Sequence, residues 1–203
     1  MNITADSLDV SRETFEKLEA FDALLKKWNP KINLVSRKSL ADVWVRHISD
    51  SLQVYSCLNA SGHWVDLGSG GGFPGVIVAI VASVENPGLN VTLVESDQRK
   101  SAFLRTVLRE TVSVGMVITD RIENIEPLDA DILSARALSD LPRLLEFSQR
   151  HLKSTGIALF PKGATWKKEV EEAKQEWNFD FEAVKSVTEP SAVVLKIKGV
   201  ELA

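Results

Sequence analysis

The chain has 203 residues, of which 44% are hydrophobic and 26% are charged, and its formal net charge is −4. This composition is typical of one folded domain, or of one domain with an added segment, and it excludes a disordered, collagen-like or coiled-coil chain. A single cysteine excludes an internal disulfide and argues against a cysteine-based zinc site, so we expect no metal site.

The sequence predicts neither a membrane span nor a secretory leader. The longest apolar run, residues 76–84, is about half of the roughly 20 residues that a membrane-spanning helix requires. The first residues, MNITADSLDVSRE, are acidic and polar, whereas a signal peptide starts with a basic and then an apolar stretch. We therefore expect a cytoplasmic protein with no membrane partner.

The first 62 residues predict a helical segment. Over residues 11–28, apolar side chains recur at spacings of three and four, and Asn29 and Pro30 predict the end of that helix. A second helix is predicted over residues 39–58. We interpret residues 1–62 as a helical extension that forms one compact unit with the rest of the chain.

From residue 63 onward, short apolar strands alternate with helices. Strands are predicted at 63–67, 90–95, 115–119, 131–135, 157–161, 179–187 and 192–198, and helices at 75–84, 98–110, 140–152 and 166–177. The connection between the last two strands is too short for a parallel crossover, so they should pair antiparallel. Residues 63–203 therefore predict an α/β domain with a mostly parallel seven-stranded sheet and helices on both faces.

The segment VDLGSGGGFPG, which follows the first predicted strand, is the most informative motif. Its spacing Gly70-x-Gly72-x-x-Gly75 matches the dinucleotide-binding fingerprint, although this match alone is weak evidence. The spacing Asp66-x-Gly68-x-Gly70-x-Gly72 instead favours S-adenosylmethionine (SAM). A carboxylate at Asp66 would repel a pyrophosphate but would attract a ligand that carries an ammonium and a sulfonium.

Glu95 ends the second predicted strand, where an acidic side chain can accept hydrogen bonds from both hydroxyls of a ribose. This position supports an adenosine ligand in nicotinamide enzymes and in SAM enzymes alike. We favour a SAM-dependent methyltransferase, and a nicotinamide enzyme and a purely structural turn remain open alternatives.

Six segments together identify a resemblance that covers nearly the whole chain: WNPKINLVS, VRHISDSL, VDLGSGGGFPG, TLVESDQRKSAFLR, SARALSDL and LFPKG. In this order they resemble the glucose-inhibited division protein B family, the RsmG-type methyltransferases of bacterial small-subunit ribosomal RNA. The resemblance implies a class I SAM-dependent methyltransferase fold, Rossmann-like, with a helical amino-terminal extension.

The resemblance also implies the reaction. A methyl group would pass from SAM to N7 of one guanosine in the 530 loop of 16S rRNA, leaving S-adenosylhomocysteine. The expected partner is 16S rRNA within the small subunit or an assembly intermediate, and the expected state of the protein is a monomer. A methyltransferase for a small molecule and a catalytically silent RNA-binding module are the alternatives.

Matched positions give the site residues that the resemblance implies. Gly68 and Phe73 should contact the cofactor, Ile122 and Glu123 should flank its adenine, and Arg136 matches the arginine of the S-R-A segment. One departure concerns RNA, because many family members have an Arg-His pair just before the final strand. Here that pair is replaced by proline and serine, at positions 190 and 191.

Two side chains near the predicted site have open roles. Arg136 can hold the cofactor carboxylate, an RNA phosphate or the guanine O6, or it can form a salt bridge with an acid such as Asp140. His47 can be a buried histidine with one hydrogen bond, or it can shape the mouth of the cofactor pocket together with Asp50 and Ser51.

A local cluster of cations predicts RNA contact despite the negative total charge. Residues 26–46 contain six lysines and arginines against one acid. Such a cluster can neutralise several phosphates, which makes binding dependent on salt. We expect Lys31, Arg37 and Lys38 from this cluster, and Lys162 from the LFPKG segment, to contact RNA. The alternative is that these are ordinary solvated helix faces.

Overall fold

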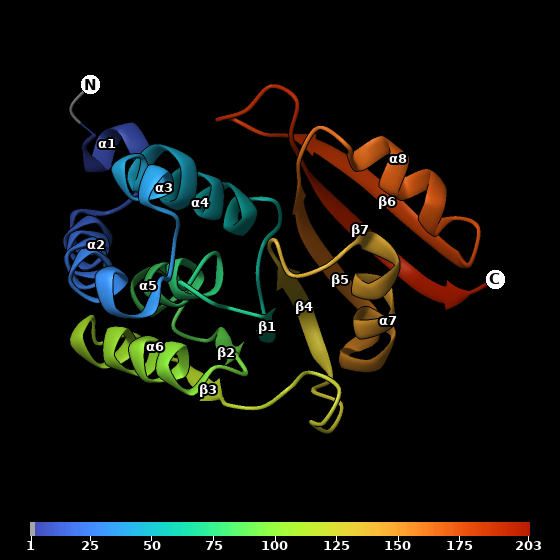
Figure 1. Ribbon diagram of the computed structural model, residues 1–203, viewed down its shortest axis with the longest axis horizontal. Helices are drawn as coiled ribbons and strands as arrows, with labels where there is room; N and C mark the ends of the chain where they lie inside the picture. Colours follow the sequence, from blue (N-terminus) through green and yellow to red (C-terminus); the bar gives the residue numbers. More distant parts are fainter. Residues whose placement is uncertain (1–2) are drawn as a thin grey trace.

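A seven-stranded sheet forms the centre of the molecule (Figure 1). The computed structural model describes residues 3–203, except for the side chains of residues 37 and 38. The strands are β1 (His63–Leu67), β2 (Asn90–Val94), β3 (Met116–Ile118), β4 (Ala130–Ala135), β5 (Leu152–Lys162), β6 (Trp177–Lys185) and β7 (Val193–Leu202). Their order is β3-β2-β1-β4-β5-β7-β6, with β1 to β5 parallel and β7 antiparallel to β5 and β6. The predicted α/β fold and its antiparallel carboxyl-terminal pair are confirmed.

Helices cover both faces of this sheet. They are α1 (Ala5–Leu8), α2 (Arg12–Ile32), α3 (Arg37–Ala41), the π-helix η1 (Val43–Ile48), α4 (Ser49–Ser56), α5 (Gly75–Glu85), α6 (Gln98–Glu110), α7 (Leu141–His151) and α8 (Trp166–Ala173). One face carries α5 and α6, on which α2 and α4 pack as an outer layer, and the other face carries α7 with α8 beside it (Figure 1). Within residues 3–203, no helix combines the length and the apolarity needed to cross a membrane.

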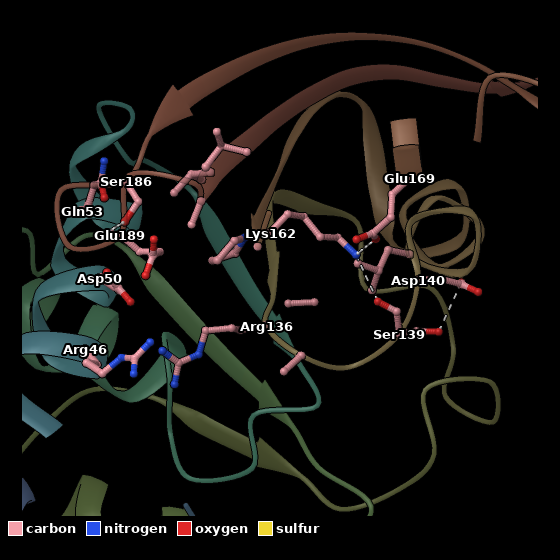
Figure 2. A pocket seen from close by; sticks show the side chains of 18 residues that line it. Arg46, Asp50, Gln53, Arg136, Ser139, Asp140, Lys162, Glu169, Ser186 and Glu189 are labelled. Atoms are coloured by element: carbon pink, nitrogen blue, oxygen red, sulfur yellow. Dashed lines mark hydrogen bonds and ion pairs between the residues drawn. The ribbon is translucent and has the colours of Figure 1, made fainter. Parts of the chain in front are cut away.

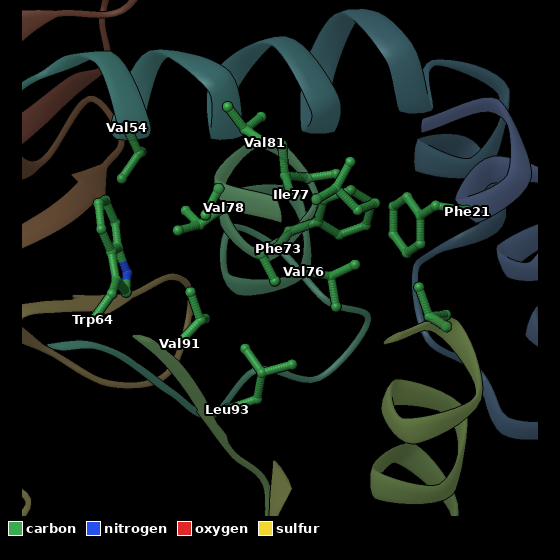
Figure 3. Packing of buried hydrophobic residues seen from close by; sticks show 14 of the residues in the cluster. Phe21, Val54, Trp64, Phe73, Val76, Ile77, Val78, Val81, Val91 and Leu93 are labelled. Carbon is green, nitrogen blue, oxygen red and sulfur yellow. The ribbon is translucent and has the colours of Figure 1, made fainter. Parts of the chain in front are cut away.

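The helical extension shares its hydrophobic core with the sheet. Phe21 of α2 packs edge-to-face on Phe73, with ring centroids 5.2 Å apart, and Val54 of α4 faces Trp64 of β1 (Figure 3). Helix α5 lies between these two contacts, and all of its residues from Gly75 to Ala82 are buried. Tertiary packing therefore overrides the low helix propensity of its many β-branched residues. The glycine loop at the start of α5 is therefore held from both sides.

The helix predicted over residues 39–58 is not one continuous α-helix in the structure. Helix α3 stops at Ala41, the π-helix follows, and α4 begins at Ser49, whose N–H bonds to the carbonyl of Trp44. A π-turn adds one residue to the hydrogen-bonded ring, so the apolar spacing survives while the helix axis does not continue regularly. Apolar spacing alone could not reveal this insertion.

Other element ends also differ from the prediction. Helix α2 passes through Pro30 and ends at Ile32, with Asn33 in the left-handed conformation as its cap. Strand β5 begins at Leu152 and β7 continues to Leu202, because ladder hydrogen bonds extend the edge beyond the apolar pattern. The helix predicted over residues 166–177 stops early, since β6 already starts at Trp177.

Candidate active site

The glycine loop joins β1 to α5 at the point where the strand order reverses, between β1 and β4. Gly68 has a φ of +65°, and a Cβ atom there would lie 2.6 Å from Cδ1 of Leu138. Side chains are strained at this φ, and the contact leaves no room for one. Gly68 therefore keeps the backbone open to the space above the carboxyl ends of the strands, where parallel sheets bind ligands.

Glu95 anchors the loop from the neighbouring strand. Its Oε2 accepts the N–H of Gly70 at 2.8 Å, and its Oε1 accepts the N–H of Asp97 at 2.8 Å. Only 7% of the residue is exposed. Each carboxylate oxygen has further lone pairs, so the two backbone bonds orient the group without exhausting it.

Three cavities meet above the loop. The Glu95 cavity, of about 410 Å³, is lined by Gly68, Gly70, Val94, Glu95, Ser96, Lys100, Asp120, Arg121, Ile122, Glu123, Ala137, Leu138, Ser139, Arg143 and Phe147. The loop cavity, of about 550 Å³, is lined by Leu34, Val35, Ser36, Ser39, Arg46, His47, Asp50, Gly68, Ser69, Gly70, Gly71, Phe73, Lys100, Arg136 and Ala137. The strand-end cavity, of about 570 Å³, adds residues from β5, the start of α7 and the β6–β7 connection (Figure 2).

Shared walls make these three cavities one groove. Gly68, Gly70 and Lys100 line both the Glu95 cavity and the loop cavity. Asp50 and Arg136 line both the loop cavity and the strand-end cavity. The groove thus runs from the end of β2 across β1 and β4 to the end of β5.

Aromatic and cationic groups stack in the middle of the groove. The ring centroids of Phe73 and His47 are 5.0 Å apart, and the guanidinium carbon of Arg136 lies 4.9 Å from the Phe73 centroid. Such a cation–ring contact is worth about 1 kcal/mol or more when it is partly desolvated. Phe73 and Arg136, predicted from separate motifs, are therefore brought together.

His47 lines the loop cavity, but the predicted single hydrogen bond is wrong. Both of its ring nitrogens are buried without a hydrogen-bond partner among residues 3–203. Burial, together with the charges of Arg136 and Arg46, lowers the pKa of His47 to about 4. The imidazole is therefore neutral at pH 7, with one donor and one acceptor that are both unused.

Arg136 does not form the alternative salt bridge to Asp140. Instead, Oδ1 of Asp140 accepts the N–H of Arg143 at 3.1 Å and caps α7. Within the described part of the chain, Arg136 has no ion pair. Burial lowers its pKa to about 10, opposed by the charges of Asp50 and Asp66, so it remains a cation. It lies beside Arg46 in the groove (Figure 2).

Asp66 lies beneath the loop rather than in the groove. It is 0% exposed, lines none of the three cavities, and accepts the hydroxyl of Ser134 at 2.6 Å. Asp66 therefore reaches no cavity in this structure, and its contact with the cofactor stays a prediction. Burial raises the pKa of Asp66 to about 6, against the effect of the Ser134 hydrogen bond.

Asp66 should make stability depend on pH in a defined direction. Because its folded-state pKa is raised above 3.8, the folded chain binds this proton more tightly, so the group adds stability as pH falls through 6. The free energy of unfolding of Asp66→Asn minus that of the wild type should be about 2 kcal/mol higher at pH 7.5 than at pH 4.5. Urea unfolding of both proteins at the two pH values measures this difference. An equal difference at both values would contradict it.

Ile122 and Glu123, which the resemblance places beside the adenine, follow β3 and both line the Glu95 cavity. Ile122 is 8% exposed, and the Glu123 carboxylate pairs with Arg143 at 2.6 Å between Oε1 and Nη2. Arg143 in turn lies over the ring of Phe147, at 4.5 Å from its centroid. The sequence reasoning missed Lys100, Leu138 and Arg143 as wall residues, although the first two lie within recognised segments and Arg143 lies two residues after one.

The predicted RNA-binding residues have different outcomes. Nζ of Lys162 bonds to Glu169 at 2.7 Å and to the Ser139 carbonyl at 3.1 Å, and its side chain is only 9% exposed. Lys162 thus lies in the cavity wall with its charge paired inside the protein (Figure 2), and its contact with RNA stays a prediction. Lys31 is exposed in the last turn of α2. The side chains of Arg37 and Lys38 lie outside the described residues.

Comparison with known proteins decides the family. The family model for rRNA small subunit methyltransferase G, also named GidB, matches residues 14–196. The chain belongs to this family. The predicted family is thus confirmed, and with it the enzyme class of methyltransferase.

Curated relatives with the same name align with this chain over almost their whole length. A ribosomal RNA small subunit methyltransferase G of Ruegeria pomeroyi is 61% identical over 196 residues, which cover 97% of this chain and 96% of the relative. One from Paracoccus denitrificans is 47% identical, with 95% and 98% covered. The sequence similarity therefore includes both the helical extension and the sheet.

Solved structures with low identity show the same fold. The PH0226 protein of Pyrococcus horikoshii has a TM-score of 0.59 at 13% identity, covering 85% of this chain and 96% of that one. TYW2 of M. jannaschii in complex with AdoMet has a TM-score of 0.54 at 15% identity, covering 74% and 73%. These likenesses support the class I methyltransferase architecture.

Proposed function

We propose that this protein transfers the methyl group of SAM to N7 of a guanosine in the 530 loop of 16S rRNA. The observation that carries the proposal is the continuous groove, with Glu95 at one end, the glycine loop and Arg136 in the middle, and the strand-end cavity beyond. Family membership supports ribosomal RNA of the small subunit as the substrate class.

The residues of the groove fit SAM. Glu95 presents a carboxylate, oriented by two backbone N–H groups, that can accept the ribose hydroxyls. Ile122 and Glu123 lie beside it, where an adenine would follow the ribose. The carboxylate of the methionine part matches the unpaired Arg136 guanidinium. When bound there, SAM supplies a methyl group on a positively charged sulfur.

The strand-end cavity continues beyond Arg136 and can receive an extruded base. It is open at the surface between α4, the β6–β7 connection and the start of α8 (Figure 2). Lys162 in its wall is paired with Glu169. A base from a loop reaches such a cavity at an unstacking cost of a few kcal/mol. The exposed Lys31 and its neighbours on the helical extension would contact RNA outside the groove.

The chain needs no general base for this reaction. N7 of guanine holds a lone pair in the plane of the ring, which forms the new N–C bond while the electrons of the C–S bond stay on sulfur. His47 is neutral, since its pKa is lowered to about 4, so it adds no positive charge beside a base that becomes cationic. The task of the residues is to orient the two reactants, which can lower the barrier by roughly 7–11 kcal/mol.

Arg136→Ala should weaken the binding of SAM. Removing the guanidinium deletes the cation that faces the methionine carboxylate, so we expect SAM affinity to fall by about 10- to 100-fold. Calorimetric titration with SAM measures this change, and a methylation assay measures its effect on turnover. Arg109→Ala is a suitable control, because Arg109 is exposed in the last turn of α6 and lines none of the three cavities. Wild-type values for both assays would remove Arg136 from the site.

The proposal is tested by mapping the product. The purified protein is incubated with methyl-labelled SAM and with either free 16S rRNA or small subunits from a strain that lacks this protein. Cleavage at N7-methylguanosine then locates the label. We expect one labelled guanosine in the 530 loop. Label at another atom or nucleotide, label on a small molecule only, or SAM binding without transfer would each overturn the proposal.

A further inference from the structure

We propose that Asp50 selects guanine at the methylation site by accepting hydrogen bonds from N1–H and the N2 amino group of the target base. This inference rests on the proposed function, because it assigns a recognition residue to the same groove. Asp50 lies in the first turn of α4 and lines both the loop cavity and the strand-end cavity. It therefore stands where cofactor and base would meet.

The carboxylate of Asp50 is held in place from the far end of the chain. The hydroxyl of Thr188, in the β6–β7 connection, donates to Oδ1 of Asp50. No other hydrogen bond to this carboxylate is present in the described part of the chain. Oδ2 and the remaining lone pairs of Oδ1 are thus available to a ligand, and the group lies between Arg46 and Glu189 in the cavity (Figure 2).

Other polar groups in the strand-end cavity are already used. The Gln53 amide donates to the carbonyl of Lys185 at 2.6 Å and accepts the N–H of Val187 at 3.1 Å. Lys162 bonds to Glu169 at 2.7 Å. The two arginines can only donate, so they cannot accept the N–H groups of guanine. Among the other carboxylates that line this cavity, Glu169 pairs with Lys162, and both Asp140 and Glu189 are exposed. Within the described part of the chain, Asp50 is thus the half-buried carboxylate of this cavity that has no ion pair.

Guanine differs from adenine on its Watson–Crick edge, which adjoins the edge that carries N7 and O6. Guanine presents two adjacent donors there, N1–H and the N2 amino group, whereas adenine presents the lone pair of N1. A carboxylate pairs with the two donors and repels the lone pair. Sites built to bond a polar group reject an analogue that lacks it, because the buried acceptor is left unpaired.

The same contact would also favour the reaction. Methylation at N7 makes the base cationic, so N1–H and the N2 amino group become stronger donors as the new bond forms. A fixed carboxylate then binds the transition state more tightly than the ground state. Loss of the carboxylate should therefore lower kcat and not only raise KM.

The test uses small subunits reconstituted with 16S rRNA that carries inosine at the target position. Inosine keeps N7, O6 and N1–H but lacks the N2 amino group. With the wild-type enzyme, kcat/KM should fall by about 10- to 100-fold on the inosine substrate. With Asp50→Asn, kcat/KM on guanosine should fall by about 100-fold, and the preference for guanosine over inosine should nearly vanish.

Glu189→Gln is the matched control, since it makes the same carboxylate-to-amide change in the same cavity. It should keep the wild-type preference for guanosine. A merely structural role of Asp50 would lower both rates equally and leave the preference intact, which would overturn the assignment. Loss of the preference in Glu189→Gln instead would also overturn it.

The outcome separates this inference from the proposed function. If the wild-type enzyme does not methylate N7 of the guanosine substrate, the proposed function fails whatever Asp50 does. If the wild type methylates N7 and Asp50→Asn keeps the full preference, only the role of Asp50 fails. The melting temperatures of both variants report whether a lost rate reflects unfolding.

Discussion

Glu95→Gln should lower the affinity for SAM by about 100-fold. The charged acceptor loses its ribose hydrogen bonds, and the amide nitrogen of the glutamine meets the N–H of either Gly70 or Asp97, where Glu95 accepts both at 2.8 Å. Hydrogen bonds to a charged group contribute about 1.5–3 kcal/mol each, and the donor–donor contact adds a cost in the glycine loop. Calorimetric titration with SAM measures the change.

The control for this prediction is Glu110→Gln, which makes the same chemical change on the exposed end of α6. It should bind SAM like the wild type. A melting curve of Glu95→Gln shows whether the fold survives, and a chain that folds and binds SAM with wild-type affinity would contradict the role of Glu95.

Gly75→Ala should cause the largest loss of stability among single-methyl additions in the loop and α5. A Cβ atom at Gly75 would lie 2.4 Å from Cδ2 of Leu93 and 2.5 Å from Oδ2 of Asp66, both of which are fully buried. Overpacking of this kind costs about 3 kcal/mol. For a chain of this length, the melting temperature should fall by about 10 °C, which thermal unfolding followed by circular dichroism measures.

Gly88→Ala is the matched control, because nothing lies within 4 Å of the added atom there. At such a position the substitution changes stability by less than about 1 kcal/mol, mainly through the unfolded chain. Equal melting temperatures for Gly75→Ala and Gly88→Ala would show that α5 can move away from β1 and β2, contrary to the packing described.

Sequence patterns were enough for the fold wherever one short segment carries the signal. The glycine loop follows directly on β1, and Glu95 directly on β2, so the positions of both at the carboxyl ends of neighbouring strands were predicted correctly. The strand and helix alternation gave the parallel sheet, and the short connection before β7 gave its antiparallel edge. These features depend on residues that are close in the chain.

Sequence patterns were not enough where neighbours from other elements decide the surroundings of a side chain. Lys162 reads as a surface cation, but Glu169 and the Ser139 carbonyl hold it in a cavity wall. Asp66 belongs to the recognised spacing, yet it points beneath the loop toward Ser134. Neither partner is specified by the motif, because each comes from another element of the fold.

The sequence by itself determined the family, the sheet and the positions of the loop, Glu95 and Arg136, since hydrophobic periodicity and local motifs encode them. Only the tertiary structure decided which polar groups remain free. The contact of Thr188 with Asp50 joins segments more than one hundred residues apart. The π-helix depends on a backbone insertion, and the unpaired nitrogens of His47 depend on what packs around that side chain. Burial and hydrogen-bond partners are properties of packed neighbours, so they appear only when the chain is folded.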